Sequence, residues 1–194
     1  MSTLLAISTA ATAVIIVLVV IAVLVLVLFA VLGERKKLRS KFGPEYERTV
    51  RKLGTYKGER ELRKREKRVE HLHIRPLSEA NRERFTAEWL SIQREFVDNP
   101  DKSLAHADGL VAEVMTVRGY PVRDFEQRAE DISVDHPRVV ENYRAAHNIT
   151  VTHGRGEAVT EEIRQAIIHY RALFDELVPS IHTDEYASTE RRIS

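Results

Sequence analysis

Residues 13–32 read AVIIVLVVIAVLVLVLFAVL, an unbroken run of twenty apolar side chains. As a helix that rises 1.5 Å per residue, the run would span about 30 Å, which is the thickness of the hydrocarbon core of a bilayer. Its many valines and isoleucines favour a strand in water, but the run is far longer than a strand. Because a backbone in lipid must satisfy its own hydrogen bonds, we predict a transmembrane helix within an anchor of residues 1–33.

A cleaved signal peptide is the alternative interpretation of this segment. Such a peptide begins with basic residues, has a shorter apolar region and ends at a site of small residues. Residues 1–13 contain no Lys or Arg, and only a poor cleavage site precedes Glu34. We therefore favour an anchor that stays attached to the chain.

The residues that flank the apolar run predict its orientation. A basic collar follows the run directly and consists of Arg35, Lys36, Lys37, Arg39 and Lys41. Basic residues concentrate on the cytoplasmic side of membrane helices. We therefore expect the N-terminus outside the cell membrane and residues 34–194 in the cytoplasm, with the basic collar in contact with anionic lipid head groups.

Charge divides the rest of the chain into two parts. Residues 34–68 hold 15 Lys and Arg against 6 Asp and Glu, whereas residues 69–194 hold 15 against 23. A second basic run at residues 60–68 could lie on the membrane, bind nucleic acid, dock on an acidic surface or remain solvated. Nucleic acid is disfavoured, because the run lacks aromatic residues for stacking and the body beyond it is acidic.

Hydrophobic periodicity after residue 33 is helical throughout. Pro44 and Gly54 bound a short helix, residues 55–58 suggest a hinge, and a thin apolar seam predicts a weakly packed helix up to residue 74. Ser78 is a good N-cap, and Gly119 is a natural C-terminal stop. We predict an all-α chain with a basic juxtamembrane segment and linker at 34–77, a cytoplasmic bundle of four or five helices at 78–178, and a disordered tail at 179–194.

Several strings of the cytoplasmic part resemble a known group of proteins. They are IRPLS (74–78), RGYPVRDFEQRAEDISVDHPRVVENYRAAH (118–147) and HYRALFDELV (169–178), behind an FGPEY segment (42–46). The chain is similar over residues 42–178 to a group of bacterial single-pass, membrane-anchored proteins with no assigned activity. The resemblance implies a bacterial inner-membrane protein and carries no catalytic residue over.

The sequence contains no motif for catalysis, for a metal or for another cofactor. It has no cysteine, no Gly-x-Ser-x-Gly and no His-Glu-x-x-His. Its single Glu-x-x-His, Glu70 to His73, falls short of the four-carboxylate set that a di-iron bundle requires. The eight histidines are therefore most simply surface or capping residues.

One polar cluster is conceivable inside the bundle. Tyr143 and His147 share a helix face at a spacing of four, and His169 and Tyr170 lie on the last helix. Together they could form a small-ligand or catalytic pocket, although buried tyrosines usually only pack. We expect instead a binding or scaffolding module with membrane lipids and an unidentified protein as partners, and keep the pocket as the alternative.

Overall fold

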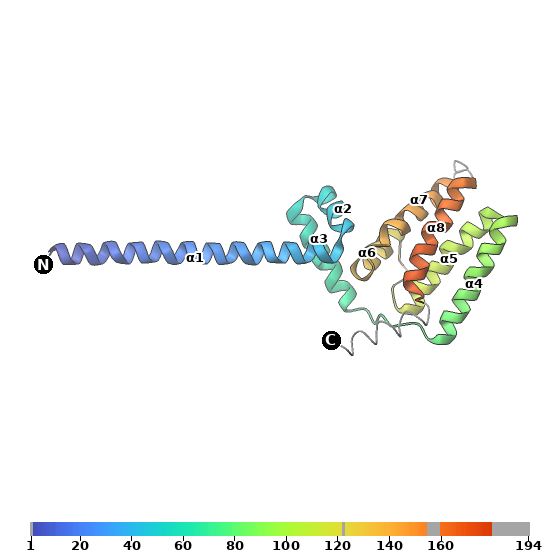
Figure 1. Ribbon diagram of the computed structural model, residues 1–194, viewed down its shortest axis with the longest axis horizontal. Helices are drawn as coiled ribbons and strands as arrows, with labels where there is room; N and C mark the ends of the chain where they lie inside the picture. The colour runs from blue at the N-terminus through green and yellow to red at the C-terminus, as the bar shows by residue number, and fades with distance from the viewer. Residues whose placement is uncertain (1, 122, 155–159, 180–194) are drawn as a thin grey trace. The chain divides into compact units, whose positions relative to one another are not determined.

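The computed structural model describes residues 2–121, 123–154 and 160–179, and every regular element in these ranges is an α-helix (Figure 1). The predicted all-α class is thus confirmed. The chain divides into two compact units, Met1–Lys41 and Phe42–Ser194, here called unit 1 and unit 2. The second unit therefore includes residues 44–77 as well as the predicted bundle at 78–178.

Helix α1 (Ser2–Phe42) makes up unit 1 as far as Lys41 and is continuous from the apolar run through the basic collar. Its part Val14–Phe42 is long and apolar enough to cross a membrane, and it is the one helix of this kind among the described residues. The predicted N-terminal helix of spanning length is therefore present. Gly43, with a φ of 49°, and Pro44 end it and begin the next helix.

Helices α2 (Pro44–Leu53) and α3 (Thr55–Glu70) pack against each other at the start of unit 2. Gly54 connects them with a φ of 79°, so residues 55–58 are the first turn of α3 rather than a hinge. A Cβ atom at Gly58 would lie 3.0 Å from the Cα atom of Val50. A larger residue here would require the α2 backbone to shift by a few tenths of an ångström.

The bundle contains α4 (Glu79–Asp98), α5 (Pro100–Arg118), α6 (Phe125–Asp135), α7 (Val140–His153) and α8 (Thr160–Leu177). Helix α7 packs on α8, α8 on α5, and α5 on α4, while α6 contacts both α3 and α7. Trp89 of α4 and Phe174 of α8 stack in the core, with ring centroids 4.8 Å apart. The arrangement agrees with the predicted four or five helices.

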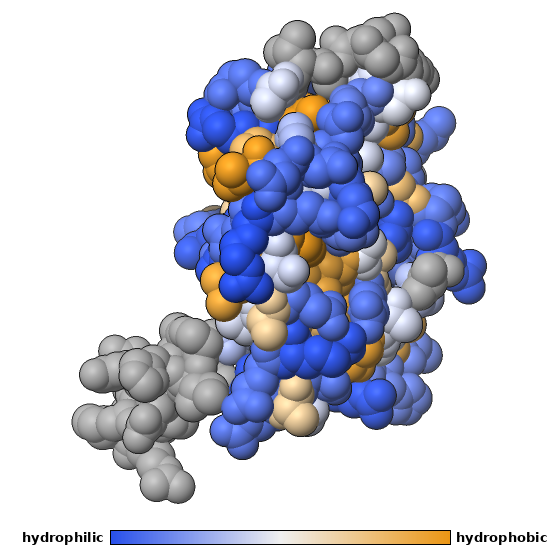
Figure 2. All heavy atoms as spheres, turned by 90° about the vertical axis from the view of Figure 1, so that its right-hand side faces the viewer, coloured by the Kyte–Doolittle hydropathy of each residue, from blue (hydrophilic) through white to orange (hydrophobic). Residues whose placement is uncertain are grey.

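The helix boundaries follow the capping residues of the sequence. The Ser78 side chain accepts a hydrogen bond from the Asn81 backbone N–H, and Gly119 ends α5 with a φ of 101°. The face of unit 2 that Figure 2 shows is mostly hydrophilic, with small apolar patches. Residues 180–194, which make up almost all of the predicted tail, lie outside the described residues.

Candidate functional site

The basic collar occupies the last turns of α1, directly after the apolar run. Its residues are Arg35, Lys36, Lys37, Arg39 and Lys41, and none of Arg35, Lys36 and Lys37 is buried. A cluster of cations at this place suits anionic head groups. Contact with lipid stays a prediction.

Three of the four residues of the predicted His/Tyr cluster lie together in the bundle. The rings of Tyr143 and Tyr170 meet edge to face with centroids 6.4 Å apart, and both are fully buried. Phe125 inserts beside Tyr143 and stacks on His147, with centroids 3.6 Å apart. His169 does not join them, because its Nδ1 atom lies 3.0 Å from the Asn142 side-chain oxygen.

The polar atoms of this cluster are unequally satisfied. The Tyr170 hydroxyl donates to Asp108 over 2.8 Å and lies 3.1 Å from the Thr150 hydroxyl. The Tyr143 hydroxyl and Nδ1 of His147 are buried and have no hydrogen-bond partner in the described part of the chain. Burial raises the pKa of Tyr143 to about 12 and lowers the pKa of His147. The rings belong to the core, and a ligand pocket here stays a prediction.

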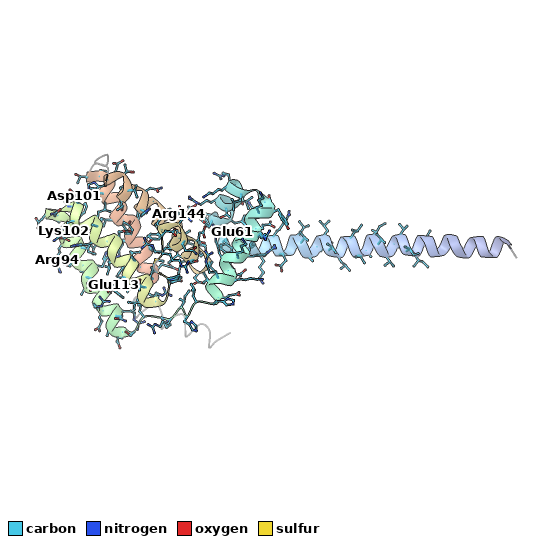
Figure 3. All side chains as sticks on the ribbon, turned by 180° about the vertical axis from the view of Figure 1, so that it is seen from behind. Glu61, Arg94, Asp101, Lys102, Glu113 and Arg144 are labelled. Carbon is cyan, nitrogen blue, oxygen red and sulfur yellow. The ribbon has the colours of Figure 1, made fainter. Side chains whose placement is uncertain are left out.

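A buried ionic network joins the α2–α3 pair to the rest of unit 2. Glu45 of α2 is 1% exposed, and its Oε1 atom accepts hydrogen bonds from Arg65 at 2.9 Å and Arg144 at 3.2 Å. Arg65 also donates to Glu130 over 2.9 Å, and Arg144, labelled in Figure 3, donates to Glu126 over 2.7 Å. The network therefore connects α2, α3, α6 and α7.

The network changes the interpretation of the basic run at residues 60–68. Arg65 is 6% exposed, and Arg68 donates to Asp131 over 2.7 Å and to Glu130 over 3.1 Å. Leu62 of the thin apolar seam is fully buried. The α3 helix is therefore packed on one face rather than solvated all round, and two of its arginines neutralise acids of the bundle.

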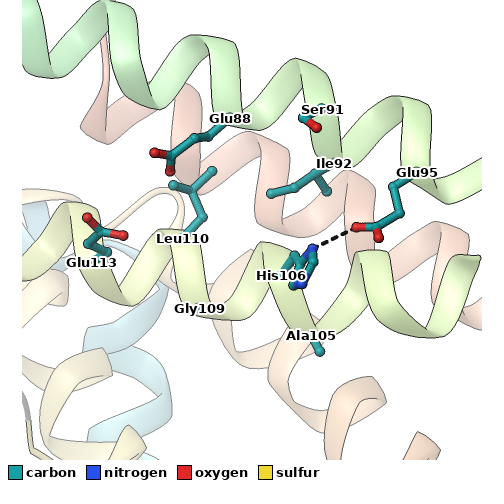
Figure 4. A pocket seen from close by; sticks show the side chains of 9 residues that line it. All are labelled: Glu88, Ser91, Ile92, Glu95, Ala105, His106, Gly109, Leu110 and Glu113. Atoms are coloured by element: carbon teal, nitrogen blue, oxygen red, sulfur yellow. Dashed lines mark ion pairs between the residues drawn. The ribbon is translucent and has the colours of Figure 1, made fainter.

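A groove of about 320 Å³ runs between α4 and α5 (Figure 4). Ile92 and Leu110, each 5% exposed, form its apolar floor. Glu88 and Glu95 border it from α4, and Glu113 borders it from α5. We call it the acidic groove; its remaining lining residues are Ser91, Ala105, His106 and Gly109.

The carboxylates of the acidic groove are paired with cations near the surface. Glu95 contacts Lys102 at 2.7 Å and Nδ1 of His106 at 2.6 Å. The hydrogen bond from Lys102 lowers the pKa of Glu95, and His106 adds to this effect. Arg84 reaches Glu113 at 2.8 Å and Glu88 at 3.0 Å. These pairs are partly exposed, so water and other cations can replace them readily.

Gly109 opens the wall of the acidic groove in the middle of α5. Glycine inside a helix costs about 1 kcal/mol relative to alanine. A Cβ atom at this position would meet nothing within 4 Å, so no contact among the described residues requires glycine here. The position instead leaves the backbone of α5 open to approach from outside.

The sequence assigned no binding or catalytic role to any residue of the acidic groove. Gly109 was the available signal, because an isolated glycine inside a helical pattern indicates either a packing or a functional reason. In the described ranges, no three His, Asp or Glu side chains are placed to hold a metal ion. No protein-family model, no curated protein and no solved structure matches the chain.

Proposed function

We propose that the protein is a single-pass inner-membrane protein that presents unit 2 as a binding module in the cytoplasm. The apolar helix Val14–Phe42 and the basic collar after it support this topology. The resemblance to bacterial anchored proteins supports the inner membrane. The basic collar would bind anionic head groups next to the anchor.

The acidic groove would receive a cationic segment of a partner protein. The observation that carries this proposal is Gly109, a costly helix residue with open space beside it in the wall of the groove. A backbone can approach closely there, its apolar side chains can cover Ile92 and Leu110, and its Lys or Arg side chains can exchange with those that now pair with the glutamates. Charge complementarity then selects cationic over anionic partners.

Site-specific photocrosslinking in native membranes tests this function. A photoreactive residue replaces Ser91, an exposed residue that lines the groove, so that Gly109 is kept. A second protein carries the photoreactive residue at Val97, which is 81% exposed on the same helix pair but does not line the groove. We expect position 91 alone to capture a segment rich in Lys and Arg. Capture of the same proteins from both positions, or of an acidic segment from position 91, contradicts the proposal.

A charge variant makes the test specific to the groove. The double substitution E88Q/E113Q removes two of its carboxylates and should lower the crosslinking yield from position 91. Glu161→Gln removes an exposed carboxylate of α8 that pairs with Arg164 and should leave the yield unchanged. Equal yields from both variants would show that the carboxylates of the groove do not select the partner.

A second candidate function is a small-ligand or enzymatic bundle at the His/Tyr cluster. The observation that favours it is the pair of unsatisfied polar atoms, the Tyr143 hydroxyl and Nδ1 of His147. A polar ligand that bonded to both would shift the ring resonances of His147 in an NMR spectrum and leave those of His71, an exposed histidine of the same chain, unchanged. Screening of a library of small polar compounds without such a shift would remove this candidate.

A further inference from the structure

The connection between α2 and α3 presents two apolar side chains to solvent among several cations. Tyr56 is 78% exposed and Leu53 is 39% exposed. Every residue from 51 to 57 is exposed, and Arg60 follows one turn later on the same helix. We call this surface the α2–α3 tip; it consists of Arg51, Lys52, Leu53, Tyr56, Lys57 and Arg60.

The cations of the tip differ from those that hold unit 2 together. The internal network uses Arg65 and Arg68 of α3, which bond to acids of α2 and α6. Next to the tip, Arg48, Arg51 and Lys52 line a hollow of about 560 Å³. Pro44, Glu47 and Glu141 complete the lining of this hollow. Its three cations outnumber its two carboxylates by one, so the lining carries a net positive charge that suits a phosphate group.

The composition of the tip is typical of a surface that lies in a membrane interface. Tyrosine is enriched at head-group level because its ring is amphipathic, and a leucine beside it favours the acyl boundary. Each Lys or Arg near an anionic surface contributes about 1 kcal/mol, within a Debye length of the lipid. The tip therefore combines two apolar side chains with four cations.

The anchor would keep the tip near lipid without a strong affinity of its own. Helix α1 continues for ten residues from the end of the apolar run at Leu32 to Phe42, where unit 2 begins. This is about 15 Å of helix. A surface on a tethered unit meets lipid at a high effective concentration, so a low affinity of that surface for lipid is sufficient for binding.

We propose that the α2–α3 tip is a second membrane contact, which binds an anionic lipid surface. Tyr56 and Leu53 enter the head-group layer, and Arg51, Lys52 and Lys57 bind lipid phosphates, some of them in the hollow beside Arg48. This contact limits how unit 2 can turn about its anchor. It goes beyond the binding function proposed above and can fail independently of it.

The chain contains no cysteine, so a thiol-reactive dye labels only the one cysteine that a substitution introduces. Tyr56→Cys is labelled with an environment-sensitive dye in the full-length protein, which is then reconstituted in vesicles of phosphatidylcholine with or without phosphatidylglycerol. Val97→Cys, at an apolar position that is 81% exposed, is the control label. We expect a blue shift of emission and quenching by spin-labelled lipid at position 56 in the anionic vesicles, both weakened by salt, and no change at position 97.

A pair of charge variants separates the tip from general positive charge. R51Q/K52Q/K57Q should abolish the blue shift at position 56. R63Q/K64Q/K67Q removes the same number of cations from exposed positions of α3 outside the tip and should preserve it. An equal loss in both variants would overturn the proposal. So would a label at position 56 whose emission stays that of water in anionic vesicles. A label that shifts when double-stranded DNA is added to neutral vesicles, and not in anionic vesicles, would overturn it as well.

Discussion

Replacement of Glu45 by alanine should remove the centre of the ionic network that joins α2 and α3 to the bundle. Glu45 is 1% exposed and bonds to Arg65 and Arg144, which are 6% and 5% exposed. Removal of one partner from a buried ion pair costs about 3–5 kcal/mol, because it leaves buried charge without compensation. Arg65 and Arg144 each keep a second carboxylate, so we expect the lower end of this range, about 3 kcal/mol.

Urea unfolding of the full-length protein in mild detergent measures this loss. Trp89 is the only tryptophan and is 1% exposed in the core, so its fluorescence reports the unfolding of unit 2. With a urea dependence of about 2 kcal/mol per M, a loss of about 3 kcal/mol lowers the midpoint by roughly 1.5 M. Glu45→Gln keeps the side-chain volume and removes the charge, and it should lose most of the same free energy.

Glu126→Ala is the matched control for this prediction. Glu126 also pairs with Arg144, but its side chain is 60% exposed. Arg144 keeps Glu45 in this variant and the lost carboxylate is exposed, so the loss should stay below about 1 kcal/mol and the variant should unfold close to the wild type. If Glu45→Ala also lies within about 1 kcal/mol of the wild type, or Glu45→Gln is as stable as the wild type, the network does not hold the helices together and the reasoning is refuted.

Further substitutions test the remaining parts of the account. Gly109→Ala should raise the free energy of unfolding by about 0.5–1 kcal/mol. Gly58→Ala should lower it, because a Cβ atom there would meet the α2 backbone. Equal effects of the two substitutions would contradict the packing of α2 on α3. Tyr143→Phe removes an unsatisfied hydroxyl and should be neutral or stabilising, while Tyr170→Phe loses a hydrogen bond and should cost about 1 kcal/mol in the same urea assay. Burial lowers the pKa of His147 in the folded state, so its contribution to stability is complete above about pH 6.5 and decreases as the pH falls below that value. His147→Gln should therefore weaken the dependence of the thermal unfolding temperature on pH below about 6.5.

Local signals in the sequence predicted most of the helix boundaries. Pro44, Gly54, Ser78 and Gly119 each begin or end a helix where their backbone preferences and capping groups indicate. The apolar run predicted a helix of spanning length because only its composition and length are needed for that conclusion. Such features act within a few residues of the chain, so a single sequence displays them.

The ionic network and the acidic groove depend on residues that are distant in the sequence. Arg65 and Glu130 are 65 positions apart, and Glu45 and Arg144 are 99 positions apart. Helical periodicity could not identify these partners, so the basic residues of α3 predicted a helix surrounded by solvent. The His/Tyr cluster was partly predictable, since Tyr143 and His147 share a helix face, but the place of His169 depends on how α8 rotates against α7.

Labelling of single cysteines in intact cells tests whether the protein is anchored in the membrane with unit 2 in the cytoplasm. Thr3→Cys and Val97→Cys each introduce one thiol into a chain that has none. In spheroplasts treated with a membrane-impermeant maleimide, we expect position 3 to react at once and position 97 to react only after lysis. Reaction of position 97 in intact spheroplasts, with position 3 protected, would contradict it.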